Sequence, residues 1–148
     1  AKIGQDKYCF SLDNNNTSFP IRLAKPRLNS TGTGTNSVIL DGFIEQGLMV
    51  FEQGYDSNVL GITEEGKKAK VWSTTDGACV GRRAVDEIKE WTEPGNGNQK
   101  VVRVTYTWKL VDVPGWIDKK AFASVKGMNE PADSAMNLVK TSNGWKAN

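Results

Sequence analysis

The chain contains no histidine among its 148 residues. This absence excludes Ser-His and Cys-His nucleophilic sites, a histidine general base and nearly all catalytic zinc sites. Only two cysteines are present, Cys9 and Cys79, and they lie 70 positions apart. Two thiols so far apart in the sequence do not have the spacing of a structural zinc site. The groups left for catalysis are carboxylates, lysines, tyrosines and a thiol.

Long apolar runs and a strong charge of either sign are also missing. The longest unbroken hydrophobic run extends from Leu48 to Phe51, far short of the roughly 20 residues that a transmembrane helix needs. The 19 basic and 17 acidic side chains give a formal charge of +2, too slight a surplus for the electrostatic footprint of a nucleic-acid-binding protein. We therefore expect no membrane span and do not expect nucleic acid as a partner.

One carboxylate cluster, made of Asp86, Glu87, Glu90 and Glu93, is a candidate for acid–base chemistry. A glycosidase needs two carboxylates that flank the scissile bond and face each other across a cleft. These four side chains lie close together on one segment, with Lys89 among them, which is typical of a solvated charged face. We therefore expect no enzyme activity, no catalytic residue, no metal and no cofactor.

The most patterned segment of the chain is 101–111. Its residues alternate between apolar and polar side chains, which predicts a half-buried strand. Tyr106 and Trp108 fall on the same side as three aliphatic residues, so we assign both rings to the wall of the core. With 148 residues and a hydrophobic fraction of 38%, the chain is long enough to bury a core, and we expect one globular domain covering residues 1–148.

The segment Val85–Thr92 can be interpreted in two ways. Its apolar residues match helical spacing, yet a tight turn at Pro94–Asn98 follows and the strong strand comes next. Because a strand after a tight turn usually pairs with the segment before that turn, we predict a strand, with a helix as the alternative.

The remaining segments complete a predicted α+β fold with an antiparallel sheet. A helix is expected near residues 37–47, covering Val38–Gln46, capped by Asn36 or Ser37 and ended by Gly47. A short helix is expected at Ile117–Ala123, and a C-terminal hairpin at Met136–Lys140 and Asn143–Trp145. Further strands are expected at Tyr8–Leu12, Phe19–Leu23, Leu48–Glu52, Val59–Ile62 and Ala69–Thr74.

The two cysteines are predicted to form a disulfide. A bridge from Cys9 to Cys79 would close a loop of about 70 residues, which the chain-entropy model values at roughly 4 kcal/mol. The alternative is two unrelated buried thiols. The absence of an initiator Met and a polar surface rich in Asn and Gly indicate a processed, exported protein. A removed leader or lipid anchor and a trimmed chain are equally consistent with that start.

A series of short motifs resembles small, mostly uncharacterised exported proteins and lipoproteins of Gram-negative bacteria. The resemblance implies a periplasmic or secreted location and an α+β fold, and it carries over no catalytic residue. A cysteine at the position of Cys79 belongs to the pattern, which supports the disulfide. The motifs are Gly47-Leu48, Ile62–Lys67, Cys79–Gly81, Trp91–Pro94, Val104–Lys109, Pro114–Trp116 and Asn143–Trp145.

These observations favour a non-catalytic exported binding protein, such as an inhibitor, a toxin-immunity protein or an antibiotic self-protection factor. Its expected partner is another protein of the envelope. Trp116, which follows the Pro114-Gly115 turn, is the first candidate binding residue, and Trp145 in the C-terminal hairpin is the second.

Two alternative functions remain open. The first is a carbohydrate or cell-wall binding module that uses exposed Trp side chains. The second is a winged-helix-like DNA-binding domain, suggested by the segment Leu60–Ala69 after a predicted helix and strand. The predicted helix Val38–Gln46 contains Asp41 and Glu45 but neither Lys nor Arg, which is unfavourable for contacts with phosphates. The oligomeric state is left open.

Overall fold

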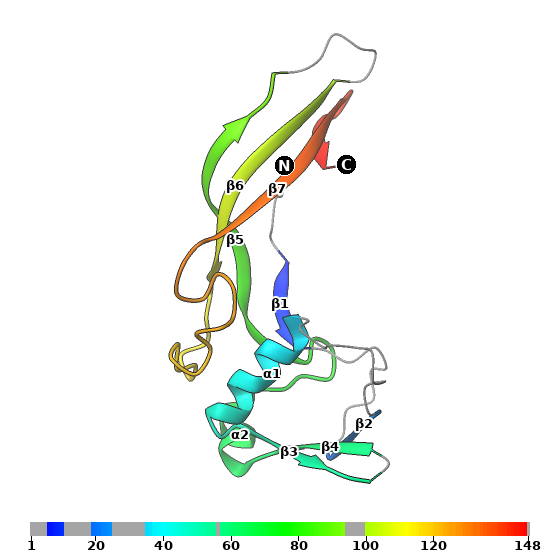
Figure 1. Cartoon of the computed structure of the whole chain (residues 1–148), viewed down its shortest axis with the longest axis vertical. Helices are drawn as coiled ribbons and strands as arrows, with labels where there is room; N and C mark the ends of the chain where they lie inside the picture. The colour runs from blue at the N-terminus through cyan, green and yellow to red at the C-terminus, as the bar shows by residue number, and fades with distance from the viewer. Residues whose placement is uncertain (1–5, 11–18, 25–34, 56, 94–99, 148) are drawn as a thin grey trace.

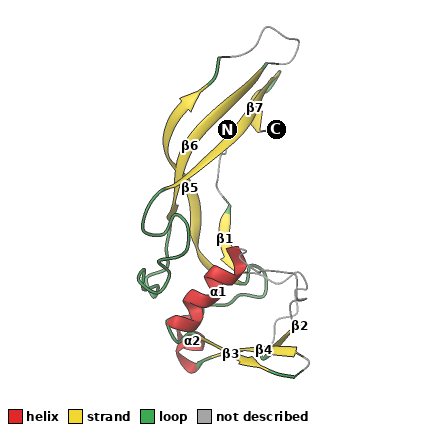
Figure 2. Ribbon diagram, viewed as in Figure 1, coloured by secondary structure: helices red, strands yellow, loops and turns green. Residues whose placement is uncertain are grey.

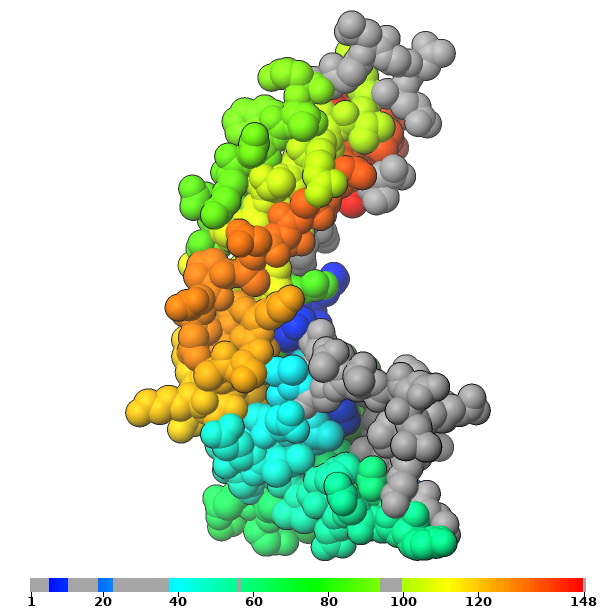
Figure 3. All heavy atoms as spheres, in the orientation of Figure 1, coloured from blue at the N-terminus to red at the C-terminus, as the bar shows by residue number. Residues whose placement is uncertain are grey.

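The computed structural model describes residues 6–10, 19–24, 35–55, 57–93 and 100–147. The molecule is elongated, with a long curled sheet rising from a base that holds both helices and a small second sheet (Figures 1 and 2). The space-filling view shows the upper part of the long sheet as a curved arm (Figure 3). The predicted antiparallel sheet is thus confirmed within a strand-rich fold that has two helices. That the whole chain is one domain stays a prediction.

All strand pairings within the two sheets are antiparallel. The long sheet has the order β1-β5-β6-β7-β8, and the small sheet has the order β2-β4-β3. In chain order the elements are β1 (Lys7–Phe10), β2 (Ile21–Ala24), α1 (Thr35–Glu45), β3 (Met49–Gln53), β4 (Ser57–Ile62), α2 (Glu64–Ala69), β5 (Ala78–Trp91), β6 (Val101–Val111), β7 (Ala132–Thr141) and β8 (Gly144–Ala147).

Strands β5 and β6 confirm the two central strand predictions. β6 has the bounds expected from its alternation and is the middle strand of the long sheet. β5 is a strand rather than a helix and begins earlier than expected, at Ala78. The predicted turn at Pro94–Asn98 lies outside the described residues. The C-terminal hairpin is confirmed as β7 and β8, with β7 beginning already at Ala132.

Two β-bulges explain the helix-like spacing in β5. Val85 pairs with Trp108, Ile88 with Tyr106 and Trp91 with Val104, so three residues of β5 match two of β6 at each step. The register shifts lie between Val85 and Glu87 and between Ile88 and Glu90. Each bulge adds one residue to β5, and residues three apart therefore reach the same side of the sheet.

The predicted strand Ala69–Thr74 is wrong, because a second helix, α2, precedes an irregular segment there. The Thr63 side chain accepts a hydrogen bond of 3.1 Å from the backbone N–H of Gly66 and so caps the helix. Acidic residues occupy the first turn and basic residues the last, which suits the helix dipole. Lys70 ends α2 in the left-handed conformation, with φ of 54°.

The predicted short helix at Ile117–Ala123 is also wrong. Backbone N–H groups in this segment donate to carbonyls three residues back, as from Ala121 to Asp118 at 3.1 Å and from Ala123 to Lys120 at 3.3 Å. The segment is therefore a series of turns rather than a helix. Gln46, just after α1, fixes one turn, since its Oε1 accepts from the Asp118 backbone N–H at 2.9 Å.

Helix α1 is confirmed, with a different start. It begins at Thr35, so Asn36 and Ser37 lie inside its first turn and the predicted cap positions are wrong. Gly47 follows its end with φ of 76°, as the sequence predicts.

The hydrophobic core lies in the lower part of the molecule. It joins residues of α1, of both sheets and of the turn segment 113–128, and its largest fully buried side chains are Phe43, Phe122, Ile39, Met49, Leu60 and Val80. Trp108 packs against this cluster and lies 5.7 Å from the Tyr8 ring, which agrees with its assignment to the core wall. Tyr106 is half-buried higher on the sheet, outside the cluster.

We call the side of the long sheet that carries Trp108 the inner face, and the opposite side the outer face. The inner face of β6 contains Val102, Val104, Tyr106, Trp108 and Leu110. Only its lower end, at Leu110, belongs to the core cluster. Val102 and Val104 are buried as well, but outside that cluster.

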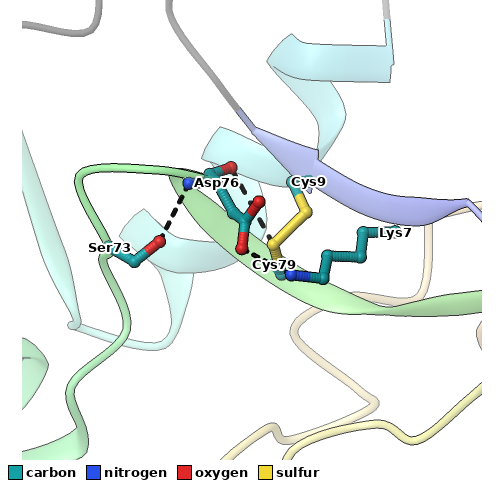
Figure 4. Close-up of a disulfide and its surroundings, with 5 residues drawn as sticks. All are labelled: Lys7, Cys9, Ser73, Asp76 and Cys79. Carbon is teal, nitrogen blue, oxygen red and sulfur yellow. Dashed lines mark hydrogen bonds and ion pairs between the residues drawn. A yellow bond between two sulfur atoms is a disulfide. The ribbon is translucent and has the colours of Figure 1, made fainter.

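The predicted disulfide between Cys9 and Cys79 is present. The two residues are cross-strand partners in the β1–β5 pair, so the bond ties the first strand to the sheet (Figure 4). Lys7 forms an ion pair with Asp76 at 2.6 Å beside it. The bond is compatible with an extracellular location, since disulfides persist in oxidising compartments.

Candidate binding grooves

The two candidate binding residues from the sequence line two different grooves. Trp116 lies in a groove of about 400 Å³ near the disulfide, which we call the lower groove. Trp145 lies in a groove of about 610 Å³ at the other end of the long sheet, which we call the upper groove. The structure therefore does not bring the two tryptophans together, and each groove is judged separately.

The charged side chains of the lower groove are largely paired. Lys7 pairs with Asp76, and Arg82 pairs with Asp112 at 3.1 Å. The lining residues are Lys7, Lys70, Val71, Ser73, Asp76, Gly77, Cys79, Gly81, Arg82, Asp112, Pro114 and Trp116. Its polar groups are thus mostly engaged with one another.

Trp116 is integrated in the packing of the lower part of the molecule. Its ring lies 5.6 Å from the ring of Phe43, and it packs against the core cluster. Its backbone carbonyl accepts a hydrogen bond from Gln46 Nε2. These contacts favour a structural contribution of Trp116, while its role in binding stays a prediction.

The upper groove is apolar and lies on the inner face of the sheet. Val102 and Val104 form its floor, with 7% and 6% of their surface exposed. Its sides hold large apolar side chains that remain accessible: Trp91 is 63% exposed, Ile88 52% and Trp145 37%. The lining residues are Ile88, Trp91, Thr92, Glu93, Val102, Val104, Leu138, Asn143, Gly144 and Trp145.

Strand register places these side chains on one face. Trp91 pairs with Val104 of β6, and Val102 of β6 pairs with Leu138 of β7. Trp145 of β8 pairs with Lys140 of β7, two residues after Leu138. Because directly paired residues of adjacent strands point to the same side, the apolar surface extends across four strands. The bulges in β5 are what bring both Ile88 and Trp91 to it.

Two charged residues of opposite sign lie beside the upper groove. Glu93 lines it after the end of β5, and Lys140 of β7 pairs with Trp145 and so shares its face. Neither side chain forms an ion pair with another described residue. Glu87 and Glu90 pair with Thr107 and Thr105, and Lys146 pairs with Val139, so these three charges lie on the outer face.

On the outer face of the sheet, some of the charges pair with each other. Lys109 pairs with Asp86 at 3.0 Å, and Lys89 contacts Asp133 at 3.7 Å. Asp86 also accepts from the Thr107 hydroxyl at 3.5 Å. Of the predicted carboxylate cluster, Asp86 thus belongs to the outer face, whereas Glu93 lines the upper groove.

Trp91 is the groove residue that sequence reasoning missed as a candidate. In the sequence it was one apolar position of the segment Val85–Thr92 and the first residue of the motif Trp91–Pro94, and neither marked it as a binding residue. The signal that could have identified it is the spacing of three between Val85, Ile88 and Trp91, since a bulged strand gives this spacing as readily as a helix.

The segment behind the winged-helix alternative has the order helix α1, hairpin β3–β4 and helix α2. The described charged residues of α1 are Asp41 and Glu45, both acidic and both exposed. An acidic helix repels phosphates, which argues against this alternative.

Within the described ranges, no cluster of three or more potential ligands from His, Cys, Asp and Glu could hold a metal ion. No helix in the described part of the chain is long and apolar enough to cross a bilayer. The sequence matches no protein-family model, no curated protein and no solved structure. The resemblance to exported bacterial proteins therefore stays a prediction, and the upper groove has to be interpreted from its own chemistry.

Proposed function

We propose that this chain is a non-catalytic, exported binding protein that holds an apolar segment of another protein in its upper groove. The observation that carries the proposal is the cluster of accessible large apolar side chains on one concave surface, Ile88, Trp91 and Trp145. Contiguous exposed apolar surface of this kind marks interaction sites in folded proteins. Tryptophan is also enriched among the residues that dominate binding energy.

The composition of the groove favours a protein over a carbohydrate. Its floor consists of valine side chains and Leu138, and only three of its ten lining residues, Thr92, Glu93 and Asn143, have polar side chains. A sugar presents many hydroxyl groups, which would lose their hydrogen bonds to water on such a floor. An apolar protein segment loses none, and it gains burial of the two indole rings.

The disulfide supports the exported part of the proposal, because such bonds are rare in reducing compartments. The expected partner is thus a protein of the periplasm or the cell exterior. An inhibitor, a toxin-immunity protein and a self-protection factor would all use such a surface.

A quantitative capture experiment tests this function. The intact chain is immobilised, periplasmic extract is passed over it, and bound proteins are quantified by mass spectrometry. We expect the double variant Trp91→Ala/Trp145→Ala to lose its main captured protein while it melts like the wild type. Val50→Ala is the matched control, since Val50 is 45% exposed on β3, away from the groove.

A third variant separates the two grooves. If Trp116→Ala abolishes capture at an unchanged melting temperature, and the double variant does not, the binding surface is the lower groove and the proposal is wrong.

A further inference from the structure

The edges of the long sheet beside the upper groove are unsuited to pairing with an added strand. Beyond Arg83, no described strand pairs with the edge of β5 that is turned away from β6. This part of β5, from Ala84 to Trp91, carries two bulges and a row of charged side chains. β8, at the opposite edge, has only four residues and includes Lys146. Bulges, charges and short length are the features by which natural sheets prevent edge pairing. A partner that enters the groove must therefore bind through side chains.

The open part of the inner face is about as long as a helix of a few turns. From Lys100 to Tyr106 the strand rises about 20 Å at roughly 3.3 Å per residue. A helix of about 13 residues has the same length at 1.5 Å per residue. The groove is lined from β5 on one side and β8 on the other, around a floor from β6 and β7, which makes the surface concave as a helix requires.

The lower end of the same face already lies in a core that includes a helix. Leu110 is on the inner face of β6 and shares the core cluster with Ile39 and Phe43 of α1. The upper groove continues this face beyond the part that α1 and the turn segment help to bury (Figure 1).

The charges on the two borders specify the flanks of such a helix. Glu93 on the β5 border suits a basic residue, and Lys140 on the opposite border suits an acidic one. Opposite charges facing each other across an interface favour association and suppress partners with like charges.

From these observations we infer that the upper groove binds an amphipathic helix of the partner protein. The helix is three to four turns long, with one apolar face, basic residues on one flank and acidic residues on the other. This inference rests on the proposed function and names the kind of segment that the groove accepts.

The test uses labelled synthetic peptides of 14 residues and the full chain with its disulfide intact, with binding followed by fluorescence anisotropy. The first peptide has a leucine face, a lysine flank and a glutamate flank at helical spacing. The second has the same composition with a central proline, which breaks the helix. The third has the same composition in strict alternation, which favours a strand. Two further helical peptides carry only lysine or only glutamate on both flanks.

We expect the first peptide to bind at least tenfold more tightly than the proline and strand-patterned peptides. It should also bind more tightly than either peptide with uniform flanks at low salt. Trp91→Ala/Trp145→Ala should weaken its binding at least tenfold, and Val50→Ala should leave it unchanged. Exchanging the two flanks is not a useful control, because a helix that runs in the opposite direction restores the match.

Three outcomes overturn the inference. The first is that the strand-patterned peptide binds as tightly as the helical one, which would indicate an extended partner. The second is that no peptide binds and sedimentation shows a dimer that Trp91→Ala/Trp145→Ala dissociates, which would indicate a second copy in the groove. The third is that no peptide binds although capture from extract still requires Trp91 and Trp145. In that last case the proposed function stands and only the helical partner is wrong.

Discussion

The lower and upper parts of the long sheet have similar alternation but different surroundings. On the inner face, Leu110 and Val104 are buried to almost the same degree, with 7% and 6% of their surface exposed. Leu110 is covered by other layers of the molecule, in a cluster with Phe122 and Phe43. Val104 lies instead between side chains of the sheet itself, including Trp91, which remains 63% exposed. A buried floor with exposed sides distinguishes a groove from a core, although the strand pattern is the same.

The largest effect that we expect comes from the lower part. Phe122 is 1% exposed and lies edge-to-face with Phe43 at 5.1 Å. Phe122→Ala should lower the free energy of unfolding by about 3–5 kcal/mol, as truncation of a buried aromatic ring leaves a cavity. Denaturant unfolding measures this loss. A loss below about 1 kcal/mol would mean that the turn segment does not complete the core.

Loss of the disulfide should have the next largest effect. The chain-entropy model gives roughly 4 kcal/mol as an upper figure for a loop of 70 residues. Denaturant unfolding of the double variant Cys9→Ala/Cys79→Ala should show a loss of up to that size. Intact mass after alkylation without reductant checks the bond itself, and rapid labelling of two thiols in the native protein would contradict it.

A smaller effect is expected where the turn segment approaches β6. Gly127 has φ of 78°, and a Cβ added there would lie 2.5 Å from the Trp108 ring. Gly127→Ala should therefore destabilise the chain by roughly 1–3 kcal/mol, through backbone strain and overpacking. Gly115→Ala is the matched control, because a Cβ at Gly115 would meet nothing within 4 Å. Equal melting temperatures of the two variants would show that Gly127 lies less close to the Trp108 ring than described.

The smallest effect on stability should come from the upper groove. Trp91→Ala should change the free energy of unfolding by about 1 kcal/mol or less, since most of the ring is already exposed to water. The difference between the losses in free energy of unfolding of Trp91→Ala and Phe122→Ala, measured in the same denaturant, tests the distinction between groove and core. A loss near that of Phe122→Ala would make Trp91 a packing residue and would remove the basis for a groove.

Strict alternation made β6 predictable from the sequence. The C-terminal hairpin was predicted as well, and Gly47 indicated the end of α1 because glycine adopts the left-handed conformation that often follows a helix. In β5 the bulges hide the alternation, and only the position of the segment before a turn and a strong strand indicated a strand. The segment 117–123 was mispredicted as a helix, whereas its amides donate three residues back. Local patterns do not determine which of these hydrogen bonds form.

The groove was less predictable than the fold. The exposure of Trp91 and the half-buried position of Trp116 depend on which segments cover them, and this is decided by contacts between residues far apart in the sequence. Trp116 follows a Pro-Gly turn and was the first candidate, yet it packs against Phe43 of α1. Trp145 was the second candidate and lies in the upper groove.

The most direct test follows the five tryptophans at once. Their indole N–H signals can be assigned by single substitutions and recorded by NMR before and after addition of the captured partner protein. We predict that the signals of Trp91 and Trp145 shift, while those of Trp72, Trp108 and Trp116 stay in place. A shift of Trp116 with Trp91 and Trp145 unchanged would contradict the claim that the upper groove is the binding surface.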